Sequence, residues 1–449
     1  MSWSTSKLGV GTSAAAAVLT IAFGTVLLPA ISSASEGTVM TAAESDPRKV
    51  GWMAGSPPPA DKIIRGTDPD FFNFPKSRWT VCHFRQLMPT TGVSRGLNAP
   101  IPFARRMDSG IDAVTFTPLG GGAPMTWAAA FDANYTDGIV VLHKGAVVYE
   151  RYSGCLDQAG QHGAMSVTKS LTGLLGETLV AEGVIDEKQT VGTIIPELAN
   201  SAFGDATVRQ VLEMTTGLKY SEDYADPKAE VWTFGAAGSA LPKPPGYTGP
   251  RTYWEYLQTV QKQGEHGQAF AYKTINTDTL GWIIARKTGK SVAQLLSERI
   301  WSKMGAEQDA YYTVDSIGTP FAGGGLNAGL RDMARIGQLM LEGGTINGQR
   351  LVPEAAIQRI RAGGDKAAFA KAGYGLLKGW SYRGMWWVSH NAHGAFTARG
   401  VHGQAIYVDP AAQMVIARFS SHPKAGNAAN DPTSLPAYDA VATYLMRKR

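Results

Sequence analysis

Residues 163–170 read GAMSVTKS, and they contain a Ser-x-x-Lys spacing at Ser166 and Lys169. The run that follows, SVTKSLTGLLGETLVAEG, has its apolar residues at helical spacing, and Gly183 is placed to end the helix. Residues three apart lie on one face of a helix, so the lysine amine can reach the serine hydroxyl. A nucleophile with its base fits this spacing, and so does a capping serine beside a solvated lysine.

The same spacing occurs at Ser4/Lys7 and at Ser421/Lys424. The first pair lies in a leader-like segment, and Pro423 disfavours a helix through the second. Only the pair at Ser166 begins a long periodic helix.

The composition excludes several classes of function. The chain has 449 residues, 44% hydrophobic and 18% charged, which is typical of a globular protein. Its net charge of +5 is small and its basic residues are dispersed, so nucleic-acid binding is not indicated. The eight histidines lack metal-ligand spacing, and neither nucleotide-binding glycine motifs nor GxSxG occur, so we expect no metal and no organic cofactor.

The first 34 residues have the pattern of a secretory signal peptide. Lys7 precedes an apolar stretch, and the small residues SSA follow it, which favours cleavage after Ala34 and an exported protein, periplasmic or secreted. An uncleaved membrane anchor is the alternative, and we expect membrane contact through this segment only. In an oxidising compartment Cys82 and Cys155 could pair, although buried free thiols fit equally well.

The rest of the chain divides into an N-terminal extension at 35–115 and a catalytic region at 116–449. DGIVVLHKGAVVYERYSG predicts a β-hairpin, residues of about 185–325 are mainly helical, and the last third returns to strands before a terminal helix. This order predicts the α/β (α+β) class, with an antiparallel sheet flanked by helices and an inserted helical domain.

Five blocks in this order carry a resemblance to a known family: MSVTKSLTGLLGETLVAEG, TVRQVLEMTTGLKYSEDY, FAYKTINTDTLGWIIARKTGKS, GGGLNAGLRDMARIGQLML and GVHGQAIYVDP. Together they resemble the serine β-lactamase and penicillin-recognising family, in the branch of class C β-lactamases, D-alanyl-D-alanine peptidases and family VIII carboxylesterases. Within it the chain is most similar to the 6-aminohexanoate-dimer hydrolases. The resemblance implies a β-lactamase/transpeptidase-like fold with Ser166 as nucleophile and Lys169 beside it.

A second motif of this family, Tyr-x-Asn, matches Tyr272-Lys273-Thr274, with Thr274 in place of the asparagine. The resemblance implies that Tyr272 moves protons, and a neighbouring ammonium would lower the pKa of its phenol. A core aromatic residue at a helix start is the structural alternative.

The family's third motif, Lys-Thr-Gly on a strand, occurs literally at 287–289, but there it fits a helix C-terminus. The expected counterpart is Val401-His402-Gly403, with the Gln404 N–H and the Ser166 N–H forming an oxyanion hole. Val401 supplies no positive charge, so we expect β-lactams to be poor substrates.

Two further residues are assigned by the resemblance alone. Tyr224 corresponds to a tyrosine that contacts the scissile amide nitrogen, and Asn327 to an asparagine near the acyl group; an ordinary loop tyrosine fits Tyr224 as well. Trp386 and Trp387 fit a pocket lining, and core packing is the commoner role of strand tryptophans.

The sequence therefore predicts a serine hydrolase that cleaves small amides or esters through an acyl-enzyme. A D-alanyl-D-alanine peptidase or penicillin-binding protein is the alternative among enzymes, and a catalytically idle relative that binds peptidoglycan is the alternative outside them. The expected partner is a small-molecule amide or ester, and the oligomeric state is not indicated.

Overall fold

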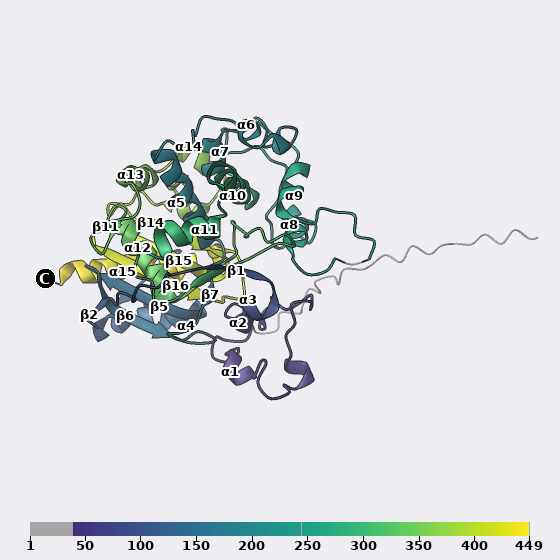
Figure 1. The fold of residues 1–449 in the computed structure, drawn as a ribbon. Helices are drawn as coiled ribbons and strands as arrows, with labels where there is room; N and C mark the ends of the chain where they lie inside the picture. The colour runs from purple at the N-terminus through teal and green to yellow at the C-terminus, as the bar shows by residue number, and fades with distance from the viewer. Residues whose placement is uncertain (1–38, 244, 449) are drawn as a thin grey trace, which may run out of the picture. The chain divides into compact units, whose positions relative to one another are not determined.

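A mixed sheet of eight strands forms the centre of the computed structural model, which describes residues 39–243 and 245–448 (Figure 1). All neighbouring strands are antiparallel except β2 and β6, which run parallel. In spatial order the strands are β12 (Ser381–Arg383), β13 (Trp386–Val388), β14 (Phe396–Gly400), β15 (Gln404–Asp409), β16 (Met414–Ser420), β5 (Thr136–His143), β6 (Ala146–Tyr152) and β2 (Ala104–Arg105).

The predicted hairpin is β5–β6. Its turn residues Lys144 and Gly145 both have positive φ, 48° and 73°. Two such residues form the turn whose twist matches that of antiparallel strands, and glycine adopts this conformation without strain.

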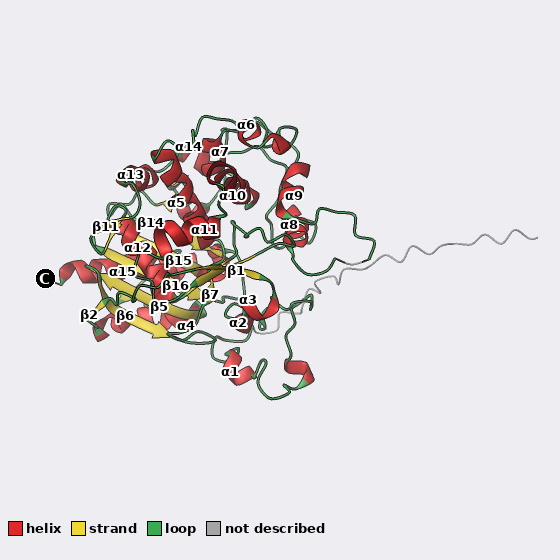
Figure 2. Cartoon of the chain, in the orientation of Figure 1, coloured by secondary structure: helices red, strands yellow, loops and turns green. Residues whose placement is uncertain are grey.

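The sheet is covered on both faces because alternate side chains of each strand point to opposite sides (Figure 2). On β5, Val140 and Leu142 belong to the larger core, with helix α12 (Leu330–Leu341) packed over the strand. Ile139 and Val141 belong to a second core, beneath α15 (Asp431–Arg447) and α4 (Trp127–Ala133). The strands are therefore buried along nearly their whole length.

Helix α5 (Val167–Ala181) lies at the centre of a helical layer and packs against α10 (Ile275–Thr288), α13 (Glu354–Ala362) and β14. A Cβ on its residue Gly173 would lie 2.0 Å from the Gly384 carbonyl oxygen, so only glycine permits this close packing. The other α-helices are α1 (Pro47–Val50), α2 (Ser77–Thr80), α3 (Phe84–Leu87), α6 (Val191–Ile194), α7 (Val208–Leu212), α8 (Glu230–Gly238), α9 (Tyr253–Thr259), α11 (Val292–Leu296) and α14 (Lys366–Ala370). Short helical turns are η1 (Ala60–Lys62), η2 (Ser109–Ala113), η3 (Pro196–Leu198), η4 (Ser297–Trp301), η5 (Gly375–Leu377), η6 (Val401–Gly403) and η7 (Asn427–Ala429).

A second sheet has the order β1 (Thr90–Val93), β8 (Ala310–Thr313), β9 (Leu326–Ala328) and β7 (His162–Gly163). Two-stranded pairs are formed by β10 (Thr345–Ile346) with β11 (Gln349–Arg350), and by β3 (Thr115–Phe116) with β4 (Met125–Thr126). The predicted class is confirmed: a mainly antiparallel sheet is flanked by helices.

The residues before β3 are tied to both sheets. Strand β1 pairs with β8, and β2 pairs with β6. A disulfide joins Cys82 to Cys155, just after β6, which decides between the two alternatives left by the sequence. Buried Arg78 also forms an ion pair with Asp137 at 2.9 Å.

Within the described chain no helix is both long and apolar enough to cross a membrane. The expected signal peptide at 1–34 lies outside the described residues.

Candidate active site

The turn that precedes α5 places Ser166 at the entrance of the helix. The Ala164 N–H donates to the Leu326 carbonyl (2.8 Å), and Met165 has a φ of 46°, a left-handed conformation that costs a methionine energy. Ser166 occupies the N-cap position, yet its side chain makes no capping hydrogen bond. The capping interpretation of the serine is therefore wrong.

Lys169 is buried, with 1% of its surface exposed, so it is not a solvated lysine. Its Nζ donates to Ser166 Oγ at 2.8 Å and to the Gly323 carbonyl at 2.7 Å. Both acceptors are neutral oxygens. Burial lowers the pKa of Lys169, and the carboxylates of Glu222 and Asp278 only partly oppose this shift.

Tyr272 contacts the same pair. It lines the same cavity as Ser166, and Lys169 Nζ lies 5.1 Å from the centre of its ring. The expected lowering of its pKa is wrong, because burial raises the pKa of Tyr272 well above its usual value and the nearby Glu222 carboxylate adds to this effect. The nearby Ser166 hydroxyl and the charge of Arg399 lower it by less. Tyr272 is therefore a neutral phenol, and Lys169 is the group that loses its proton more readily.

Glu222 is a residue of the site that the sequence reasoning missed. It accepts hydrogen bonds from the Thr274 N–H (2.6 Å), the Thr274 hydroxyl (2.5 Å) and the Tyr224 hydroxyl (2.8 Å). The threonine that replaces the family's asparagine thus holds a carboxylate at the start of α10. The pair Glu222–Tyr224 in the block KYSEDY was the available signal, because a glutamate two residues before a candidate tyrosine can reach its hydroxyl.

Asp278 is the second missed carboxyl group. It lies one helical turn after Thr274 and accepts a hydrogen bond from the Gly323 N–H (3.3 Å). The carbonyl of the same glycine accepts a hydrogen bond from Lys169. Its Oδ2 has no hydrogen-bond partner within the described chain. Burial raises the pKa of this carboxyl group, and the charge of Lys169 opposes the shift.

Ser166 lines a cavity of about 500 Å³, a volume suited to a small organic ligand. Tyr224 and Tyr272 line it, as predicted, and so does Trp387. Trp386 is instead buried, and its indole N–H donates to the Ser170 carbonyl. The remaining lining is Ser166, Glu222, Gly373, Tyr374, Gly375, Leu376, Leu377, Arg399, Gly400, Val401, Gly426, Asn427, Ala428 and Asp431.

The strand residue beside Ser166 is Gly400, and the expectation for the following residues needs correction. A Cβ on Gly400 would lie 3.0 Å from both the Ser166 nitrogen and the Ala164 carbonyl oxygen, so glycine favours this close approach. Val401 follows at the end of β14, and it lines the cavity.

His402, Gly403 and Gln404 do not line the cavity. His402 Nδ1 donates to the His422 carbonyl (2.7 Å), the Gly403 carbonyl accepts from Arg418 (2.8 Å), and the Gln404 amide donates to the Ser420 carbonyl (2.6 Å). The chain reverses between β14 and β15 at these residues, and Gln404 pairs with Gly400 across the two strands.

Asn327 is also not brought to the cavity. It lies on β9, buried opposite Gly163 and Tyr311, and its amide donates to the Gly325 carbonyl (2.9 Å). Its place beneath the turn before α5 makes it a structural neighbour of Ser166. The literal Lys-Thr-Gly at 287–289 ends α10, where Gly289 has a φ of 69°, as predicted.

The Beta-lactamase family model matches residues 128–437. The chain belongs to this family. It is 35% identical over 351 residues to a 6-aminohexanoate-dimer hydrolase of Paenarthrobacter ureafaciens, covering 78% of this chain and 86% of the relative. A solved Bacillus anthracis structure assigned to the 6-aminohexanoate-dimer hydrolases is 33% identical with a TM-score of 0.77, over 86% of this chain and 98% of that one.

A family VIII carboxylesterase structure shares the fold, with 17% identity and a TM-score of 0.52 over 76% of this chain and all of that one. The chain is thus a serine hydrolase of the amide- or ester-cleaving kind, and the predicted resemblance is confirmed.

Proposed function

We propose that the chain hydrolyses small linear amides or esters by forming an acyl-enzyme on Ser166. The observation that carries this proposal is the Lys169–Ser166 contact of 2.8 Å, in which the amine is buried and bonded only to neutral oxygens. A lysine in that setting reaches its neutral, basic form nearer neutral pH than a solvated lysine does.

In the acylation step, neutral Lys169 takes the Ser166 proton while Oγ forms a bond to the substrate's carbonyl carbon. The tetrahedral intermediate then collapses, and the bond to the leaving nitrogen or oxygen breaks. Tyr272 gives its proton to the leaving atom and regains one from the Lys169 ammonium. Water attacks the acyl-enzyme by the same proton route in reverse.

The oxyanion hole of this proposal consists of the Ser166 N–H and the Val401 N–H. Ser166 precedes α5 and Val401 follows β14, so neither N–H is used within a regular helix or strand. Neither donates to another backbone carbonyl in the described turns and loops. In related chemistry each such donor contributes about 2.7–4 kcal/mol to transition-state stabilisation.

The substrate class follows from the cavity and the relatives. Aromatic and leucine side chains line much of the wall, which suits an extended aliphatic chain. The relatives at 35% and 33% identity are described as hydrolases of the 6-aminohexanoate dimer, a linear amide. We therefore assign linear ω-amino-acid amides and short esters as substrates.

A fluorophosphonate probe tests the nucleophile, because it reacts only with an activated serine. We expect labelling of the intact protein and none of Ser166→Ala. The matched control is Ser421→Ala, which removes the serine of the other Ser-x-x-Lys spacing within the described chain and should label normally. Labelling of a folded Ser166→Ala protein, or none of the intact protein, would contradict the mechanism and favour the idle relative.

We also propose that the protein is exported with cleavage near Ala34. The leader pattern of residues 1–34 and the Cys82–Cys155 disulfide support this, since disulfides persist mainly in oxidising compartments. N-terminal sequencing of protein from the envelope or secreted fraction should begin near Ser35. Full-length protein found only in the cytosol would refute it.

A further inference from the structure

Arg399 is a cation in the wall of the cavity that the proposed mechanism does not use. It lies on β14, two residues before Val401, which follows the end of the strand, and both residues line the cavity. Only 7% of its surface is exposed, and charged side chains are seldom buried this far without a partner.

Two contacts fix the direction of the guanidinium group. One Nη2–H donates to Asp431, the first residue of α15, in an ion pair. The guanidinium carbon also lies 5.2 Å from the centre of the Trp387 ring, and Trp387 lines the same cavity. A cation held by a carboxylate and an aromatic face is already oriented before a ligand arrives.

Most of the donors of Arg399 remain available. A guanidinium carries five N–H groups, and in the described chain the bond to Asp431 is the one hydrogen bond that the Arg399 side chain makes. The planar group can accept a second carboxylate in the bidentate manner that arginine favours.

We propose that Arg399 binds a free carboxylate of the substrate, so that the site prefers amides and esters that carry one. This inference rests on the proposed function and specifies its substrate class. It also replaces the expectation drawn from Val401: the strand lacks the family's lysine, but Arg399 supplies a positive charge two residues earlier and facing the same cavity.

The test uses two ligands that differ by one charge, the 6-aminohexanoate dimer and its terminal carboxamide. Binding is measured by calorimetry in the Ser166→Ala background, and kcat/KM is measured with Ser166 present. We expect the acid to be preferred over the carboxamide by about tenfold or more, the usual effect of a charge-assisted hydrogen bond, and mainly through binding.

Arg399→Gln should bring this preference close to one, and Arg399→Lys should keep part of it. Because Arg399→Gln leaves Asp431 buried without its cation, Arg399→Gln/Asp431→Asn serves as a second variant. Arg151→Gln is the matched control, since it removes a partly exposed arginine of β6 that pairs with Asp132 of α4, and the preference should persist.

Equal binding of the two ligands, or a preference that survives in the folded Arg399 variants, would overturn the assignment. Failure to hydrolyse either compound would instead contradict the proposed amidase function. The two failures are distinguishable because binding is measured without turnover.

Discussion

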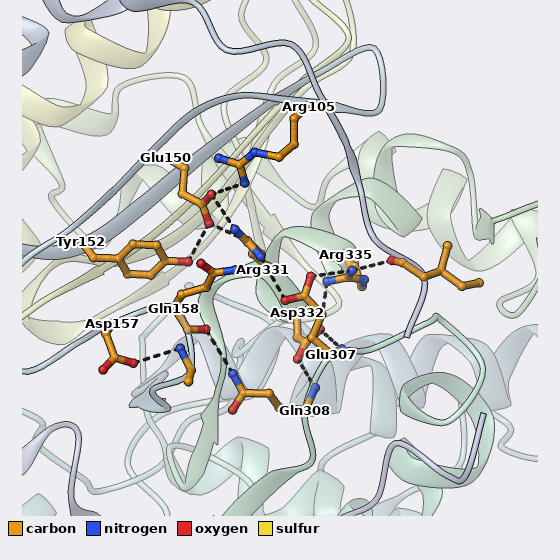
Figure 3. Close-up of polar contacts among 12 residues, drawn as sticks. Arg105, Glu150, Tyr152, Asp157, Gln158, Glu307, Gln308, Arg331, Asp332 and Arg335 are labelled. Carbon is orange, nitrogen blue, oxygen red and sulfur yellow. Dashed lines mark hydrogen bonds and ion pairs between the residues drawn. The ribbon is translucent and has the colours of Figure 1, made fainter. Parts of the chain in front are cut away.

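The molecule contains two buried groups of charges that behave in opposite ways. Figure 3 shows the first, where Arg331 of α12 donates to Glu150 of β6 at 2.6 and 2.8 Å and also pairs with Glu307. Arg105 and Tyr152 add two more hydrogen bonds to Glu150, each 2.7 Å long. The second group is Lys169 with its neighbours in the candidate active site.

In the first group the charged form of Glu150 is stabilised. Burial alone would raise the pKa of Glu150, but the hydrogen bonds from Arg331, Tyr152 and Arg105 outweigh burial and lower it to about 2. In the second group burial prevails, so the pKa of Lys169 falls and that of Asp278 rises. Two arginines and a tyrosine hold Glu150 in its charged form, whereas burial shifts the pKa of Lys169 and that of Asp278 toward neutral pH.

The largest expected effect comes from Lys169→Met. Removal of the base should lower kcat by about 10⁴-fold or more, because a nucleophile and its base act as a unit. The free energy of unfolding at pH 7 should not fall and should rise slightly, since a lysine whose folded pKa is lowered opposes folding while it is charged.

Kinetics and denaturant unfolding of the same samples give both quantities. Lys424→Met, which changes the lysine of the other Ser-x-x-Lys spacing in the described region, should alter neither. A Lys169→Met protein that keeps its activity would show that Lys169 is not the base. Strong destabilisation would show that Lys169 stabilises the fold, as the buried ion pairs do.

Tyr272→Phe should reduce kcat by about 10²–10⁴-fold, the usual contribution of a positioned proton donor. Because burial keeps the phenol protonated, the loss should be similar throughout the neutral pH range. Tyr382→Phe is a suitable control: its ring lies 6.3 Å from that of Tyr272, but it does not line the cavity. A loss that varies with pH would mean that Tyr272 itself titrates.

Glu150→Gln should affect stability and not catalysis. We expect a loss of about 2–4 kcal/mol in the free energy of unfolding at pH 7, because Arg331 would lose its main partner in a largely buried site. A carboxylate with a lowered pKa stabilises the fold above its unfolded value of 4.5, and this contribution disappears as the pH falls toward about 2.

Urea unfolding at pH 7 and near pH 3 measures this difference, which should shrink at the lower pH. Glu197→Gln removes an exposed, solvent-screened ion pair with Arg286 and should cost much less than Glu150→Gln. Equal costs for the two variants would refute the special role of the buried group.

The sequence was sufficient for the parts of the site that depend on local order. Ser166 and Lys169 are neighbours at the start of α5, and Tyr272 lies just before α10, so motif order and helical spacing predict them. The order of hairpin, helical region and closing strands likewise predicts the fold.

Contacts between distant segments could not be predicted in this way. Glu222 enters the site by bonding Thr274, which is 52 residues away. In RGVHG either glycine could approach Ser166, and Gly400 does so only because β14 ends there. The pKa of Tyr272 rises because burial outweighs neighbouring charge, and the depth of burial is a tertiary property.

The smallest expected effect concerns the carboxyl group behind Lys169. Lys169 must be neutral to accept the Ser166 proton, so kcat/KM should rise with pH through the pKa of Lys169. Negative charge on Glu222 and Asp278 stabilises the ammonium form and raises this pKa. Asp278→Asn should therefore lower the pKa of Lys169 further and move the acid limb of the kcat/KM profile to lower pH.

Asp332→Asn provides the control from the other group of charges. Burial raises the pKa of Asp332 to about 6, so it is also a perturbed carboxyl group, but it accepts hydrogen bonds from the Glu307 and Gln308 N–H groups and pairs with Arg335. Its removal should lower stability and leave the acid limb in place. If Asp278→Asn leaves the limb unmoved or shifts it to higher pH, then either Lys169 is not the titrating base or Asp278 does not act on it through its charge.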